Sequence, residues 1–180
     1  TQIECNILKR PMGKQDQYAA AFGGVNYFRF YDDESVVIKP INMNTDFLKD
    51  FNDSILMFWT GITRGSESIL AEQDKNNKDN GLILNSMRDQ SRVLSKLLIQ
   101  ENYSSEELGK LMDVGWNYKK KLASKVSNEF IDDCYDSAKK AGALGGKISG
   151  AGGGGFLLII AKKEDQDKII KEMQKKGLTE

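Results

Sequence analysis

The sequence of 180 residues contains no histidine, so the side chain most often used as a general base near neutral pH is absent. Any general base must therefore be a carboxylate, a lysine or a tyrosine. The lack of histidine also excludes a zinc site with histidine ligands. The two cysteines, Cys5 and Cys134, indicate buried thiols rather than a disulfide framework or a metal site. We therefore assign no metal-ligating residue.

The sequence also lacks an excess of charge and any long apolar run. Its 26 basic and 26 acidic residues give a formal net charge of +0, which offers no argument for binding nucleic acid or an anionic membrane surface. No apolar run approaches the roughly 18 residues of a transmembrane helix, and no signal peptide is visible. We expect a cytoplasmic globular protein with a sizeable core and no nucleic-acid or membrane partner.

An initiating methionine is missing as well. The first residues, 1–8, are already typical of an ordered segment. We expect the chain to be a fragment, or a natural protein without its expected first half.

Glycine is concentrated near the end of the chain. Five of the six residues from Gly150 to Gly155 are glycine, and the apolar segment 156–161 follows directly. A helix or strand interior disfavours such a run, because each glycine costs about 1 kcal/mol relative to alanine in a helix and gives a strand nothing to pack. A loop of this kind lets backbone N–H groups turn toward an anion or another chain segment. The alternative, a flexible linker, is normally rich in serine on both sides.

The remaining pattern predicts an α+β fold in which strands and helices are largely segregated. Two strands, 25–30 and 35–41, flank a polar turn and indicate a hairpin. Ser104 and Glu107 predict a capping box at the start of a helix. The other expected elements are helices at 14–22, 63–73, 82–100, 128–142 and 164–176, strands at 54–59 and 156–161, and a surface loop at 74–81.

Several blocks in this order resemble the GHMP kinases, the family of galactokinase, homoserine kinase, mevalonate kinase and phosphomevalonate kinase. Lys147, the glycine run and the strand after it resemble the third conserved motif of the family. The segment Gly-Lys-Gln-Asp-Gln-Tyr-Ala-Ala-Ala-Phe-Gly-Gly at 13–24 resembles the helix with the catalytic aspartate. The sugar-kinase branch, of the heptose 7-phosphate kinase type, is similar in the blocks FWTGITR (58–64), WNYKKKL (116–122), VSNEFID (126–132) and AGALGGK (141–147).

The resemblance implies two domains and a reaction. Residues 1–52 would be the remainder of an N-terminal domain like the second domain of ribosomal protein S5, and 53–180 a ferredoxin-like C-terminal domain. The reaction would be phosphorylation of a sugar or sugar phosphate with ATP and Mg²⁺. The main nucleotide loop of the family, of the Gly-Leu-Gly-Ser-Ser type, is absent and would lie before Thr1. We therefore expect the chain on its own to lack kinase activity and to bind nucleotide weakly.

The resemblance also implies roles for individual residues. Asp16 would orient or deprotonate the sugar hydroxyl, and the alternative is a solvated aspartate at a helix start. The loop residues expected to approach the ATP phosphates are Gly150, Ala151, Gly152, Gly153, Gly154 and Gly155. The residues expected to contact the sugar are Gln15, Gln17, Thr60, Gly61 and Arg64. Ordinary polar positions explain the two glutamines equally well, and a solvated helix position is the favoured alternative for the arginine.

Two lysine features receive a structural interpretation. Lys147 enters the glycine loop, where a lysine most often lies along the surface and keeps its charge in water. The lysine run 119–121 belongs to a neutral chain and an amphipathic helix, so a solvated face is favoured over a phosphate or nucleic-acid site.

Two other functions stay open. The chain could be a non-catalytic sugar-binding or oligomerisation module derived from a GHMP kinase, although the retention of Asp16 argues against this. It could also be an isoprenoid-pathway or homoserine kinase, which the blocks around Asp16 and Arg64 favour less. The sequence leaves the identity of the sugar and the oligomeric state, including a homodimer, undecided.

Overall fold

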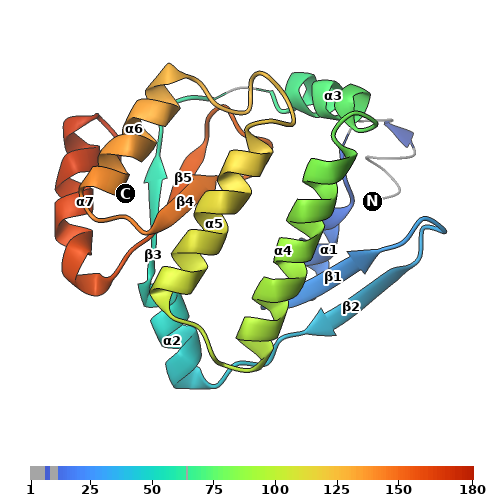
Figure 1. Ribbon diagram of the computed structural model, residues 1–180, viewed down its shortest axis with the longest axis horizontal. Helices are drawn as coiled ribbons and strands as arrows, with labels where there is room; N and C mark the ends of the chain where they lie inside the picture. Colours follow the sequence, from blue (N-terminus) through green and yellow to red (C-terminus); the bar gives the residue numbers. More distant parts are fainter. Residues whose placement is uncertain (1–6, 9–11, 64) are drawn as a thin grey trace.

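The computed structural model describes residues 7–8, 12–63 and 65–180. Cys5, Arg64 and most of the first segment therefore lie outside the described residues. The elements follow one another along the chain as shown in Figure 1: α1 (Gln15–Phe22), β1 (Asn26–Phe30), β2 (Val36–Pro40), α2 (Thr45–Asp53), β3 (Ile55–Trp59), α3 (Glu67–Asn76), α4 (Gly81–Ile99), α5 (Ser105–Lys119), α6 (Glu129–Lys140), β4 (Gly145–Ile148), β5 (Phe156–Ile160) and α7 (Lys163–Lys175).

A three-stranded antiparallel sheet organises the larger part of the molecule. Its strand order is β3-β5-β4, so β5 is hydrogen-bonded on both sides. The apolar run of β5 fits this central place, because a strand between two neighbours and under helices is buried on both faces. Helix α5 packs on β4 and β5, and α6 packs on α7. The buried cluster at their centre includes Phe58, Trp116, Ile131, Ile159 and Ile169.

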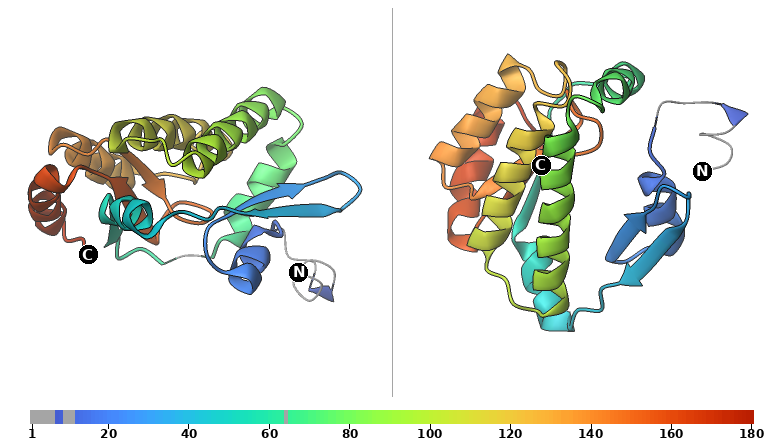
Figure 2. Two further views of the ribbon diagram at one scale, coloured as in Figure 1. Left: turned by 90° about the horizontal axis from the view of Figure 1, so that it is seen from below. Right: turned by 45° about the vertical axis from the view of Figure 1, so that its right-hand side comes forward.

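A two-stranded hairpin and a short helix form the smaller part. Strands β1 and β2 pair antiparallel, with Phe30 opposite Val36 beside the turn. Helix α1 has no buried residue, and both strands are half-buried or exposed. Figure 2 shows this part on the other side of α4 from the sheet, joined to the rest through α2.

The structure confirms the α+β class, with two small antiparallel sheets, and corrects three local predictions. Helix α2 was not expected; Asn44 caps it by accepting a hydrogen bond from the Phe47 N–H. Helix α3 begins only at Glu67 and extends to Asn76, so the predicted surface loop at 74–81 is shorter. Strand β4 was not expected either, because two of its four residues are glycine. Among the described residues, no helix combines the length and apolar character needed to cross a membrane.

Candidate functional site

The glycine loop connects β4 to β5 and is held tightly by two neighbouring loops. A Cβ atom on Gly152 would lie 2.6 Å from the carbonyl oxygen of Val126, and Gly152 has a φ of +108°. A Cβ atom on Gly154 would lie 2.7 Å from the carbonyl oxygen of Ile62. Only a residue without a side chain permits these two approaches. The loop is therefore a packed structure, and the interpretation as a flexible linker is wrong.

Two backbone amides of the loop are bonded inside the protein. The Gly153 N–H donates to the Val126 carbonyl at 2.7 Å, and the Gly155 N–H donates to the Ile62 carbonyl at 2.9 Å. These two amides hold the loop in place and are not available to a ligand. In the described part of the chain the other loop amides donate to no backbone acceptor; they belong to Gly150, Ala151, Gly152 and Gly154.

Thr60 supports the loop directly. Its N–H and its hydroxyl both donate to the carbonyl of Gly155, at 3.0 Å and 2.8 Å, and the side chain is buried. These bonds account for the hydroxyl, which was expected to contact a sugar. Gly61 follows with a φ of +74° and is exposed. Arg64, the third residue expected here, lies outside the described residues.

Asp16 lies in the first turn of α1, where the helix dipole favours a negative charge. Its side chain is exposed, and its charge acts on the ammonium group of Lys119. Gln15, beside it, is exposed and lines a cavity together with Lys147. Gln17 is half-buried, with its amide nitrogen 3.8 Å from the sulfur of Met12. The glutamines therefore differ: Gln15 lines the cavity, and Gln17 contacts Met12, which precedes α1.

Lys119 interacts both with the glycine loop and with Asp16. It is the last residue of α5 and half-buried, and its ammonium group donates a hydrogen bond to the carbonyl of Gly150. Burial and, second, the charge of Lys147 lower the pKa of Lys119 to about 8, against the opposing effect of the Asp16 charge. Burial also lowers the pKa of Lys147, in the middle of β4. The prediction of a solvated lysine face is therefore wrong for Lys119.

A cavity of about 500 Å³ lies between the small part of the molecule and α4. Its walls come from β1, from the α4 face that carries Ser91 and Ser95, and from Gln15 and Lys147. The fold thus brings together the start of α1 and the strand that leads into the glycine loop. Asp16, which stands next to Gln15, and the loop carbonyl bonded by Lys119 lie around the same region.

The sequence was then compared with known families. Residues 98–178, which include α5, β4, the glycine loop and β5, match the model of the GHMP kinases C-terminal domain. The chain contains a GHMP kinase C-terminal domain. A curated relative, D-glycero-alpha-D-manno-heptose 7-phosphate kinase from Campylobacter jejuni, is 29% identical over 155 residues. The match covers 84% of this chain and 44% of the relative, so the chain spans less than half the length of that kinase.

Solved structures show the same fold. The D-glycero-D-manno-heptose 1-phosphate kinase from Bacteroides thetaiotaomicron has a TM-score of 0.61 and 24% identity, with 97% of this chain and 46% of that chain covered. The galactokinase of Lactococcus lactis, solved with galactose, has a TM-score of 0.66 and 17% identity, with 97% and 53% covered. Both extend over the hairpin and α1 as well as over the GHMP kinase C-terminal domain, since nearly the whole chain is superposed.

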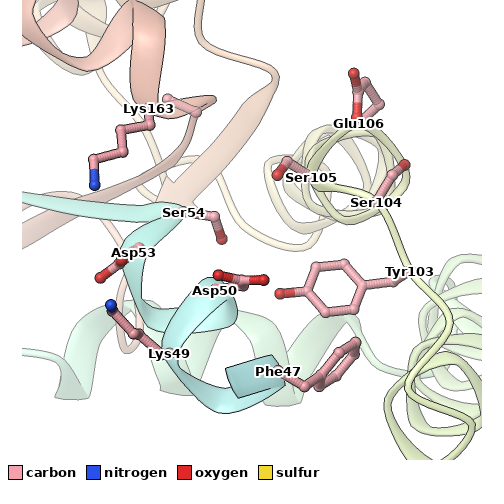
Figure 3. Close-up of a pocket in the computed structure, with 11 residues that line it drawn as sticks. Phe47, Lys49, Asp50, Asp53, Ser54, Tyr103, Ser104, Ser105, Glu106 and Lys163 are labelled. Carbon is pink, nitrogen blue, oxygen red and sulfur yellow. The ribbon is translucent and has the colours of Figure 1, made fainter. Parts of the chain in front are cut away.

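A second cavity, of about 520 Å³, lies at the opposite end of strands β3 and β5 from the glycine loop. It is lined by α2 and the start of α5, and Figure 3 shows Asp50 beside the hydroxyl of Tyr103. Ser54 precedes β3 there, whereas Thr60, which bonds the glycine loop, follows β3. Among the described residues, none of those expected to act in catalysis or binding lines this second cavity. The candidate site of the GHMP kinase domain is therefore at the end of the sheet where the glycine loop lies.

Lys119 is the functional candidate that sequence reasoning missed. It stands in the block WNYKKKL, which carried part of the resemblance, but a lysine run gives no sign that one member turns inward. Lys120 shows the difference, because it pairs with Asp132 at 3.4 Å across the surface. Among the described residues no group of three or more acidic or cysteine side chains could hold a metal ion.

Proposed function

We propose that the chain is part of an ATP-dependent kinase that phosphorylates a sugar or a sugar phosphate, with the heptose 7-phosphate type as the favoured one. The observation that carries this proposal is that Lys119 connects α1 to the glycine loop. Its ammonium group donates a hydrogen bond to the carbonyl of Gly150 and interacts electrostatically with Asp16 on α1. The similarity to a curated heptose phosphate kinase supports the same class of substrate.

In this proposal Asp16 acts on the acceptor hydroxyl. Its carboxylate is exposed and thus accessible to a small molecule. It accepts a hydrogen bond from the sugar hydroxyl, orients the oxygen toward the phosphoryl group, and takes up the proton as the new bond to phosphorus forms. Gln15, on the same turn of α1 and on the wall of the cavity, hydrogen-bonds a neighbouring sugar hydroxyl. Gly61, on the loop after β3, and Arg64 remain proposed contacts of the sugar.

The glycine loop fits a bound nucleotide on its open side. A Cβ atom on Gly150 or Gly155 would meet nothing within 4 Å, so space for a ligand exists there. Backbone amides that are not bonded within the protein would hold the phosphate oxygens. When bound, ATP supplies the phosphoryl group and Mg²⁺ neutralises its charge.

We also propose that residues 1–52 and 53–180 belong to two domains, S5-like and ferredoxin-like. The separate place of α1 and the hairpin in Figure 2 supports this division. The cavity between the two parts would then be the cleft in which sugar and nucleotide meet.

The test is the substitution Asp16→Asn in the complete protein, with Asp32→Asn on the exposed hairpin turn as the matched control. We expect kcat with ATP and a heptose phosphate to fall by about 10²–10⁴-fold in the first variant and to stay within twofold in the second. Near-normal turnover of Asp16→Asn would refute the assignment. Tight sugar binding in calorimetry without any turnover of the unmodified protein would instead support the non-catalytic module.

A further inference from the structure

Two lysines from different elements lie near the glycine loop. Lys119 ends α5 and Lys147 lies in β4, and the charge of Lys147 acts on the ammonium group of Lys119. In the described part of the chain neither forms an ion pair, although nearby lysines do. Lys120 pairs with Asp132 at 3.4 Å and Lys139 with Asp113 at 3.7 Å.

This arrangement is unfavourable for the protein alone. Both ammonium groups are half-buried, and burial disfavours the charged form of each. The charge of Asp16 on α1 opposes these effects at Lys119, but it acts more weakly than burial and Lys147. Perturbed groups of one sign at a cleft are typical of binding sites, because a ligand of the opposite sign relieves the unfavourable charge.

The shape of the site indicates which anion would bind. An ammonium group has three donors, so Lys119 can keep its bond to the Gly150 carbonyl and still donate to a ligand oxygen. Lys147 approaches from the cavity side, together with Gln15. We infer that Lys119 and Lys147 bind a phosphate group of a polyphosphate ligand from two sides, between the glycine loop and Asp16. This inference rests on the proposed function only in naming the ligand as a nucleotide. The negative charge of the ligand is inferred from the two lysines themselves.

The first experiment uses inorganic tripolyphosphate as the probe and the 180-residue chain. Lys119→Gln and Lys147→Gln are compared with Lys121→Gln, an exposed member of the same lysine run. NMR titration follows even weak binding. We expect the dissociation constant to rise at least 10-fold in each of the first two variants, as for loss of a charge-assisted hydrogen bond, and less than twofold in the third. Equal affinities in all three variants would overturn the inference.

The second measurement uses pH and does not depend on a glutamine variant that folds well. Lys119 faces Lys147 from β4, Asp16 from α1 and the Gly150 carbonyl from the loop. Tripolyphosphate affinity of the unmodified chain should fall as pH rises through about 8, because Lys119 loses its proton there. Lys119→Arg, which stays charged, should remove most of this fall. An unchanged pH profile in that variant would count against Lys119 as the phosphate ligand.

The outcomes separate this inference from the kinase proposal. If tripolyphosphate binding depends on both lysines but the complete protein phosphorylates no sugar, the phosphate site stands and the kinase proposal fails. If the complete protein is an active kinase whose KM for ATP and tripolyphosphate affinity are unaffected by Lys119→Gln and Lys147→Gln, the kinase proposal stands and the two-lysine site is wrong.

Discussion

Lys119 keeps a positive charge where the surroundings disfavour it. Its pKa of about 8 lies below the ordinary 10.5, with burial as the main cause and Lys147 as the second. Below pH 8 the folded protein must hold this charge half-buried, which lowers its stability. Between about pH 8 and 10.5 the folded lysine is neutral while the unfolded lysine still binds a proton, so stability rises with pH in that window.

The first stability prediction follows from this sign. Lys119→Met should raise the free energy of unfolding at pH 7 by about 1 kcal/mol, and the gain should disappear by about pH 10. The full pKa shift corresponds to about 3 kcal/mol, but partial exposure and the lost bond to Gly150 reduce the expected gain. Urea unfolding at both pH values measures it, with exposed Lys121→Met as the control. A variant that is less stable than the unmodified protein at pH 7 would contradict the argument.

Single residues also show what the sequence could and could not reveal about the site. Asp16 and the glycine loop were predicted because a helix start with an acid and a dense glycine run are local patterns. The inward turn of Lys119 was not, since it depends on where α5 ends relative to a loop about thirty residues later. The bonds of two loop amides to Val126 and Ile62 were not predicted for the same reason, because these acceptors come from distant segments.

At the level of elements, α5 and β4 approach each other where both lack a side chain. A Cβ atom on Gly145 would lie 1.9 Å from the carbonyl oxygen of Gly109, and one on Gly109 would lie 2.3 Å from the Cβ of Leu144. This contact fixes the position of β4, and with it Lys147 and the start of the glycine loop. It also places the C-terminal end of α5, where Lys119 reaches the loop.

Gly145→Ala should therefore destabilise the fold strongly. The collision is with backbone on a buried helix, so α5 or β4 must move, and we expect a loss of about 3 kcal/mol or more in the free energy of unfolding. Gly81→Ala is the matched control, since a Cβ atom there meets nothing and α4 begins at that residue. Its effect should be within about 1 kcal/mol of zero and on the stabilising side. Urea unfolding of both variants checks this, and equal stabilities would show that the α5–β4 contact adjusts freely.

The elements predicted from the sequence are those whose signals are local, and the α5–β4 contact explains one element that was missed. Helices α4, α5, α6 and α7 were predicted close to their observed bounds because their apolar periodicity and caps are local; Ser104 and Glu107 form the expected capping box. Strand β4 was missed because two of its four residues are glycines, which disfavour strands. Here a Cβ atom on Gly145 would collide with α5 and one on Gly146 with β5. Helix α2 was missed although Asn44 caps it, since its short polar sequence resembles a loop.

In the molecule as a whole, the buried apolar residues are distributed unevenly. The core cluster draws on β3, β4, β5 and helices α3, α5, α6 and α7. In contrast, α1 and α2 contain no buried residue, and β1 and β2 form a sheet of only two strands. A two-stranded hairpin is marginally stable by itself, so we expect the small part to be less stable than the three-stranded sheet and its helices. The cavity walls therefore belong to regions of different stability.

Hydrogen exchange should make this difference visible. Local opening has a lower free energy where few apolar contacts are buried, so the backbone amides of Asn26–Phe30 and of residues 36–39 should exchange at least 100-fold faster than those of Phe156–Ile160 at neutral pH. Mass spectrometry of peptic fragments that cover the hairpin and β5 measures both in one experiment. The difference should persist when stability is lowered by mild urea, until global unfolding dominates. Similar protection of the hairpin and β5 would mean that the chain opens as one cooperative unit, and the cavity would then have two equally rigid walls.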